Sequence, residues 1–177
     1  MRYLRYLSYV VRHKFFVCIE CWKMGLYWQG ITHDWHKLLP SEFFPYVSQF
    51  GGGIQTGRDS TGYYKPEDTG NVAFEVAWHK HQKRTWHHWQ SWCTPLTGGR
   101  VKCYPIPGKY CLEMIADWKG AGRAQGKPDT AAWWATNKDK VVMHPDTFAW
   151  FENTMKFISA ADAFREIVEE TKRAYTK

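Results

Sequence analysis

The sequence predicts an all-α fold, a single domain of five to eight helices, and three observations carry that prediction. Apolar residues recur at three- and four-residue steps over residues 2–24 and 109–124, which is the spacing of an amphipathic helix. A chain of 177 residues is long enough for one domain with a real core. Aromatic residues make up 18% of the chain, which favours a folded protein over a disordered one. We expect one domain over 1–177, with its core at about 3–150 and a packing helix at 159–177.

The first predicted helix, over residues 2–24, carries a histidine in the middle of its apolar face. Gly25 ends the helix. His13 has two interpretations: a core histidine satisfied by one hydrogen bond, or a metal ligand. The apolar face consists of Tyr6, Tyr9, Val10, His13, Phe16, Val17 and Met24.

A second helix is expected over residues 30–39, ended by Pro40, and it carries a His-Asp pair. His33 and Asp34 offer an imidazole and a carboxylate to one cation. Lys37 lies about one helical turn further on and could contact an anionic substrate. The alternative for Lys37 is a solvated surface lysine.

A short helix over residues 42–49 should follow, with Ser41 as its N-cap. Glu42 at its start is a candidate general acid or base. The alternative for Glu42 is a carboxylate stabilised by the helix dipole.

Two stretches rich in glycine and proline predict loops. Residues 51–70 contain six glycines and one proline and predict a long loop or lid. Residues 94–108 predict a second loop.

A histidine-rich run follows the first loop. Asn71 is positioned to cap a helix that starts at residue 72 and runs through the histidines. In one continuous helix His81 and His88 would lie ~10 Å apart, too far to share an ion. We therefore expect a break near 85–86 that folds His87 and His88 back toward His81. The alternative is a basic surface stripe, whose tryptophans, Trp78 among them, could stack nucleobases.

The helix predicted over residues 109–124 places Asp117 on an apolar face. Burying an aspartate without a partner is costly, so Asp117 is either a metal ligand or part of a cap or ion pair. Arg123 on the same helix could hold a phosphate or pair with the aspartate. A short helix is expected over 129–137, and another starts with Pro145 at its first position.

The net charge and the cysteine content limit the kinds of partner and the cellular compartment to be expected. The net charge of +7 favours anionic partners such as nucleotides, nucleic acid or a membrane surface. No stretch approaches ~18 apolar residues, so no membrane span is expected. Five cysteines and the absence of a signal-type segment predict free thiols in a reducing cytoplasm. The oligomeric state stays open.

The order of these residues resembles the HD-domain superfamily of metal-dependent phosphohydrolases. That order is a histidine, a His-Asp pair, further histidines and a lone aspartate, all on predicted helices. Lys37 fits the His-Asp-x-x-Lys variant of the HD-GYP branch. Several strings, including Tyr9-Val10-Val11-Arg12-His13-Lys14 and Ala116-Asp117-Trp118-x-Gly120-Ala121-Gly122-Arg123-Ala124, also resemble an uncharacterised family of phage and bacterial proteins.

The HD resemblance implies a helical bundle around a metal centre. It implies hydrolysis of a phosphate ester or anhydride, on a nucleotide or related compound. Mixed histidine and carboxylate ligands suit one or two ions of Mn, Fe, Co or Zn. The core ligands would be His13, His33, Asp34 and Asp117, and a second site would be completed by His81, His87 and His88. The catalytic candidates are Lys37, Glu42 and Arg123. The substrate-binding candidates are Lys37, Arg123 and Trp78.

Three alternatives stay open at this point. A di-iron oxygenase of HD type would use the same ligands. A nucleic-acid-binding module would use the basic surface without catalysis. A structural protein with a zinc-stapled core would have no substrate.

Overall fold

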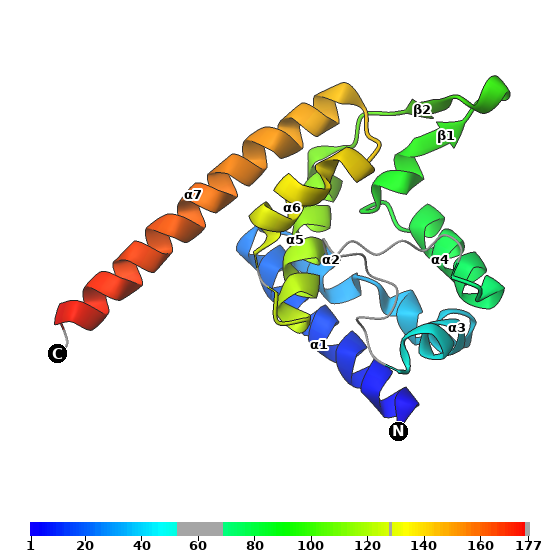
Figure 1. Cartoon of the computed structure of the whole chain (residues 1–177), viewed down its shortest axis with the longest axis horizontal. Helices are drawn as coiled ribbons and strands as arrows, with labels where there is room; N and C mark the ends of the chain where they lie inside the picture. Colours follow the sequence, from blue (N-terminus) through cyan, green and yellow to red (C-terminus); the bar gives the residue numbers. More distant parts are fainter. Residues whose placement is uncertain (53–68, 128, 176–177) are drawn as a thin grey trace.

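The computed structural model describes residues 1–52, 69–127 and 129–175, and over these ranges the protein is mostly helical (Figure 1). The predicted all-α class is confirmed, with one small two-stranded sheet added. The elements are α1 (Arg2–Lys23), α2 (Tyr27–Thr32), η1 (Trp35–Leu38), α3 (Pro40–Phe50), α4 (Val72–Arg84), η2 (Trp89–Trp92), β1 (Cys93–Pro95), η3 (Thr97–Gly99), β2 (Val101–Cys103), α5 (Gly108–Ala124), α6 (Thr130–Asn137), η4 (Lys138–Lys140) and α7 (Pro145–Tyr175).

The long helices α1 and α5 lie side by side and form the centre of the body (Figure 1). Gly120 makes their close approach possible. A Cβ atom added there would lie 2.7 Å from the backbone nitrogen of Val17, which is well inside contact distance. On its buried face α1 presents His13 between Val10 and Val17, so the expected position of this histidine is confirmed.

The expected helix over 30–39 is wrong, because the chain breaks at the His-Asp pair. Helix α2 ends at Thr32, and Asp34 adopts a left-handed conformation with φ 49° and ψ 30° before η1 begins. A short polar side chain tolerates this conformation better than most residues do. Pro40 does not end a helix but begins α3, where its missing N–H costs nothing, so Ser41 is not the N-cap.

Helix α4 begins and ends as the sequence indicates. The side chain of Asn71 accepts a hydrogen bond from the backbone N–H of Phe74, which confirms the cap. The helix stops at Arg84, and Thr85 is extended with φ −104° and ψ 118°. The predicted break near 85–86 is therefore confirmed, and it turns the following histidines back toward α4.

The segment 94–108 is more ordered than the expected loop. Strands β1 and β2 pair antiparallel, with Cys93 opposite Cys103. The hairpin links the end of the histidine-rich segment to the start of α5. The loop or lid expected over 51–70 lies mostly outside the described residues, of which only 51, 52, 69 and 70 belong to it.

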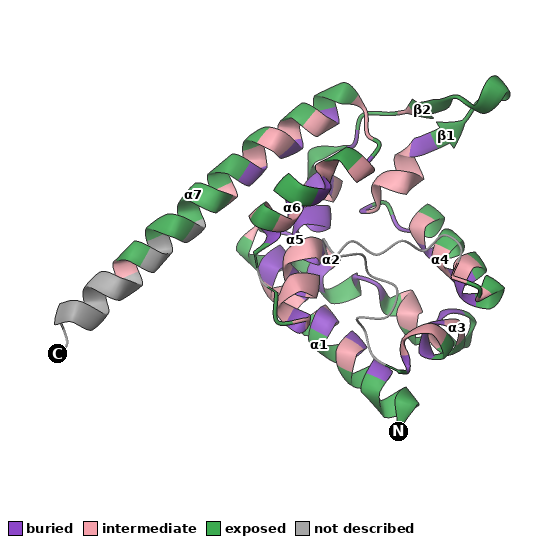
Figure 2. Ribbon diagram, viewed as in Figure 1, coloured by how far each residue is buried: buried purple, intermediate pink, exposed green. Residues whose placement is uncertain are grey.

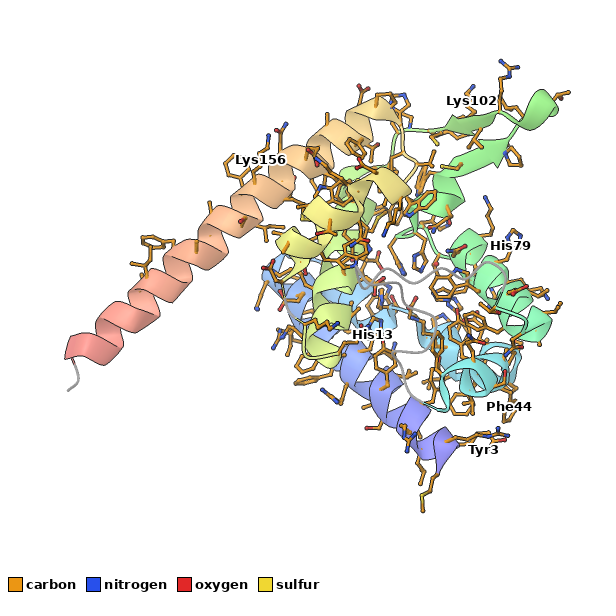
Figure 3. The ribbon with its side chains drawn as sticks, viewed as in Figure 1. Tyr3, His13, Phe44, His79, Lys102 and Lys156 are labelled. Carbon is orange, nitrogen blue, oxygen red and sulfur yellow. The ribbon has the colours of Figure 1, made fainter. Side chains whose placement is uncertain are left out.

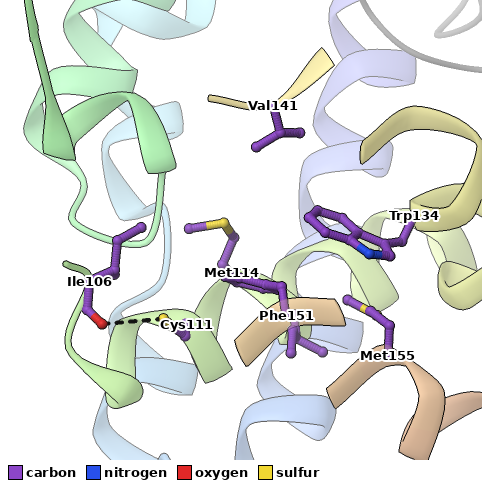
Figure 4. Packing of buried hydrophobic residues seen from close by; sticks show 8 residues of the cluster. Ile106, Cys111, Met114, Trp134, Val141, Phe151 and Met155 are labelled. Carbon is purple, nitrogen blue, oxygen red and sulfur yellow. Dashed lines mark hydrogen bonds between the residues drawn. The ribbon is translucent and has the colours of Figure 1, made fainter. Parts of the chain in front are cut away.

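A hydrophobic core forms where α5, α6 and the first part of α7 meet. Met114, Trp134, Phe151 and Met155 are buried there (Figure 4). The ring of Trp134 stacks on that of Phe151 with centroids 5.5 Å apart. This core packs against α5, the helix that carries Asp117.

Beyond Met155, α7 extends away from the body (Figures 1 and 2). Phe157 is 75% exposed and Phe164 is 69% exposed. Of these two residues only Phe164 belongs to the segment 159–177, and the expected packing of that segment stays a prediction. No glycine or proline follows Pro145, so α7 runs on as one helix to Tyr175.

Within the described ranges, none of the helices combines the length and the apolar character that crossing a bilayer requires.

Candidate metal centre

Four predicted ligands from three parts of the chain meet in one buried cluster, which we call the first cluster. It consists of His13 from α1, His33 and Asp34 from the turn after α2, and Asp117 from α5. Asp117 Oδ1 lies 3.2 Å from His13 Nε2 and 3.4 Å from His33 Nε2. Asp34 Oδ2 lies 3.4 Å from His33 Nε2 and 3.8 Å from His13 Nε2. Figure 3 shows His13 among the side chains in the interior of the body.

The histidine-rich segment supplies a second cluster: Asp34, His81, His87 and His88. Asp34 Oδ1 lies 3.4 Å from His81 Nε2 and 3.3 Å from His87 Nε2. The Nε2 atoms of His81 and His88 are 3.0 Å apart. The break after α4 makes this possible, because residues seven apart on an unbroken helix could not meet in this way.

Asp34 belongs to both clusters, and each of its carboxylate oxygens faces a different one. Oδ2 faces the first cluster and Oδ1 faces the second. The side chain of Asp34 is fully buried. Its left-handed backbone costs roughly 1–2 kcal/mol, and such strain concentrates at functional sites. The turn thus places one carboxylate between two sets of imidazoles.

The spacing of these atoms fits metal coordination. With ligand bonds of about 2.1 Å, neighbouring ligand atoms are about 3.4 Å apart in a tetrahedral site and about 3.0 Å apart in an octahedral one. Most of the distances between the facing atoms lie in that range. Several of these atoms are buried without a hydrogen bond, which is costly unless a cation satisfies them. They are Nε2 of His13, His33 and His87 and both carboxylate oxygens of Asp34, of which Oδ2 has the Lys37 ammonium 2.6 Å away.

Two further carboxylates hold the imidazole rings from behind. The Nδ1 of His33 donates to Oε1 of Glu113 at 3.3 Å, and Nδ1 of His87 lies 3.1 Å from the same oxygen. The Nδ1 of His81 donates to Oε2 of Glu42 at 3.0 Å. Carboxylates in this position fix the tautomer of a histidine and direct its Nε2 lone pair toward an ion.

The carboxylates of the centre stay ionised although they are buried. Burial alone would raise the pKa of Asp34, but His33, Lys37 and His81 hold it well below its usual value. Burial is likewise outweighed at Glu113, where the neighbouring histidines His33 and His87 lower the pKa to about 2. The buried carboxylates therefore stay ionised, which is the form that a divalent cation binds.

The histidines divide into two groups by their charge in the metal-free protein. Burial opposes protonation of His87, but Asp34 and Glu113 raise its pKa to about 10. Burial lowers the pKa of His81 to about 3. A divalent ion would replace the proton on His87 and would find His81 already neutral.

Lys37 lies against the shared carboxylate and not on the open surface. Its Nζ is 2.6 Å from Asp34 Oδ2, and its side chain is 13% exposed. Burial opposes the charge, yet Asp34 and Asp117 raise the pKa of Lys37 well above its usual value. The alternative of a fully solvated lysine is therefore wrong.

Glu42 has a defined structural role. It is 2% exposed, and its Oε1 accepts a hydrogen bond from Arg84 Nη1 at 3.2 Å while Oε2 accepts from His81. Burial raises its pKa. Its contacts make it a positioning residue for His81, not a group that faces both clusters.

Two predicted site residues do not join the clusters. Arg123 donates to Glu20 Oε1 at 2.6 Å, and its guanidinium lies over the ring of Phe16. Trp78 packs behind His81 against Tyr46, with ring centroids 6.1 Å apart. This placement does not support the expected contact of Arg123 with phosphate or of Trp78 with a nucleobase. Partners distant in the sequence, Glu20 and Tyr46, contact the two side chains instead.

Sequence reasoning missed two residues of the centre. Glu113 lies four residues before Asp117 on α5, and this one-turn spacing was the available signal. Lys14 follows His13, and its Nζ donates to the backbone carbonyl of His33, which fixes the turn. His79 lies on the exposed side of α4, as expected from its position two residues before His81 (Figure 3).

Comparison with known proteins identifies a family but no activity. No curated protein matches the chain, and no solved structure matches it either. One family matches residues 2–157, a range that includes every residue of both clusters. The chain therefore belongs to the family of unknown function designated DUF5662.

Proposed function

We propose that the protein binds two divalent metal ions and hydrolyses a phosphate ester or anhydride, with a nucleotide or related compound as substrate. The observation that carries the proposal is the shared carboxylate of Asp34, whose two oxygens each face a separate set of histidines. A bridging carboxylate between two such sets is an arrangement that holds two ions at the separation used in phosphoryl chemistry, about 3.5–4 Å.

Each of the two ions would have its own set of histidines and would share Asp34. His13, His33 and Asp117 would hold the first ion with Asp34, and His81, His87 and His88 would hold the second ion with it. Bound ions of this kind polarise a phosphoryl oxygen and lower the pKa of water. Nitrogen and oxygen ligands together suit Mn, Fe, Co or Zn.

Asp117 and Lys37 keep a small exposed fraction at the first cluster, which supports the approach of an anionic substrate there. The side chain of Asp117 is 12% exposed, and that of Lys37 is 13% exposed beside the shared carboxylate. The Lys37 ammonium would offset charge on a phosphoryl group that approaches there. Trp35, directly after Asp34, is 52% exposed and offers a surface on which a base could stack.

Metal content and phosphate release test this proposal together. Purified protein is analysed for Mn, Fe, Co and Zn and then supplied with each metal. It is assayed for phosphate release from nucleoside mono-, di- and triphosphates, and cyclic nucleotides are followed by chromatography because opening their ring releases no phosphate. Wild type should release phosphate, whereas Asp34→Ala should not. Arg123→Ala should retain activity because that side chain lies outside both clusters.

Three outcomes would contradict the proposal. Protein that is loaded with each metal and hydrolyses none of these substrates would refute the hydrolase. Iron with a visible absorption band and oxygen uptake, in place of phosphate release, would assign the oxygenase instead. Salt-dependent nucleic-acid binding without turnover would assign a binding module.

A further inference from the structure

Two cysteines face each other across the β1–β2 hairpin. The ladder pairs Cys93 directly with Cys103, and their sulfur atoms are 2.8 Å apart. Non-bonded heavy atoms normally rest about 3.5–4.0 Å apart, so these sulfurs are unusually close. Directly opposed residues on antiparallel strands have Cα atoms about 4.5–5.5 Å apart, within the range that a disulfide spans.

The hairpin connects the two parts of the chain that complete the metal centre. β1 begins five residues after His88, and β2 leads through residues 104–107 into α5, which carries Glu113 and Asp117. Lys83 Nζ donates to the backbone carbonyls of Gln90 and Cys93 at 2.8 and 2.9 Å, which ties the base of the hairpin to α4.

We propose that Cys93 and Cys103 form a reversible disulfide that staples this hairpin, with a low-molecular-weight disulfide as the oxidant. The proposal goes beyond the hydrolase and does not depend on it, since neither cysteine belongs to a metal cluster. The three other cysteines lie on helices, Cys18 and Cys21 on α1 and Cys111 on α5.

The two thiols differ in access, which sets the order of the exchange. Cys103 is half-buried and Cys93 is buried, so the Cys103 thiolate attacks a sulfur of glutathione disulfide first. That S–S bond breaks, one glutathione leaves as a thiol, and a mixed disulfide remains on Cys103. Cys93 then loses its proton to water and attacks the Cys103 sulfur, which releases the second glutathione. Two protein thiols are oxidised and one glutathione disulfide is reduced.

The experiment uses the whole protein, first reduced and then equilibrated with glutathione disulfide. Remaining thiols are alkylated in denaturant, and peptides are mapped by mass spectrometry without reductant. We expect a Cys93–Cys103 cross-link, while Cys18, Cys21 and Cys111 are alkylated as internal controls. Cys93→Ser should stop at the glutathione adduct on Cys103, and excess glutathione should reverse the cross-link in wild type.

A second measurement tests the stapling itself. The disulfide closes a loop of about 11 residues, so Tm should be about 5–10 °C higher for the oxidised protein than for the reduced protein. Cys103→Ser should show no such difference. Wild type in which Cys93 and Cys103 are both alkylated after oxidation would overturn the proposal. A persistent glutathione adduct without a cross-link, or a cross-link without a Tm rise, would also overturn it.

Discussion

Glu113→Gln isolates a carboxylate that contacts one histidine of each cluster through its Nδ1 atom. Oε1 of Glu113 contacts Nδ1 of His33 at 3.3 Å and Nδ1 of His87 at 3.1 Å, and one of these histidines belongs to each cluster. Glutamine keeps the size and one acceptor oxygen but removes the charge. The variant should therefore fold normally and bind both ions more weakly.

The expected loss can be worked out from these two contacts. A hydrogen bond to a charged group contributes about 1.5–3 kcal/mol and a neutral one about 0.5–1.5 kcal/mol, so each contact loses about 1 kcal/mol. The side chain of Glu113 is only 9% exposed, so solvent screens little of this difference. About 1 kcal/mol for each ion is roughly a fivefold loss in affinity, or about 30-fold for the pair. Variants of carboxylates behind metal-bound histidines typically lose 10–100-fold in metal affinity, so about fivefold for each ion lies just below that range.

Competition with a fluorescent chelator measures both affinities. Glu20→Gln is the matched control, because Glu20 is also buried and pairs with Arg123 and Lys23 but lies outside both clusters. It should bind both ions like wild type. Unchanged affinities in Glu113→Gln, or weakening of one ion only, would refute the reasoning.

Three further predictions follow from the same geometry. The metal-free protein holds a proton on His87 with a pKa of about 10, so a metal ion must displace that proton. Metal affinity should therefore rise with pH from 7 toward 10. Calorimetry in buffers of different ionisation enthalpy should detect the proton release at pH 7. A pH-independent affinity would contradict this. Lys37→Met removes the ammonium beside Oδ2 of the shared carboxylate, so it should destabilise the metal-free protein by about 3 kcal/mol and the metal-loaded protein by less. Thermal unfolding with and without metal measures both losses. Equal losses would argue against the ion pair. Gly120→Ala should lower the free energy of unfolding by about 2 kcal/mol, because the added Cβ would meet the backbone of Val17. Gly108→Ala is the control and should cost little, because no atom lies within 4 Å of a Cβ added there. Urea titrations that show no difference between the two variants would contradict the close packing of α1 and α5.

Sequence patterns within single helices predicted the buried face of α1 and the end of α4. The apolar stripe of residues 2–24 placed His13 on the buried face of α1, and the geometry of a continuous helix required the break that Thr85 makes. Both inferences use only the helical period and a distance along one axis. Five of the candidate ligands reach the two clusters in the way these inferences describe: His13, Asp117, His81, His87 and His88. His33 and Asp34 reach them through a turn that the helical period did not predict.

Contacts between distant segments account for what the sequence did not reveal. The left-handed turn at Asp34 depends on packing around the His-Asp pair, and spacing alone favoured a continuous helix through it. Arg123 finds Glu20, 103 residues earlier, so its own neighbours gave no indication of that pair. Glu113 acquires its role only when α5 approaches both His33 and His87.

The central claim is that one carboxylate holds two ions, and metal stoichiometry tests it most directly. Wild type, Asp34→Ala and His88→Ala are loaded with Mn or Zn, passed through gel filtration, and analysed for metal per chain, with circular dichroism to confirm that helix content is retained. The shared carboxylate predicts two ions in wild type, none in Asp34→Ala and one in His88→Ala. Wild type without metal, or Asp34→Ala that keeps two ions, would contradict the claim.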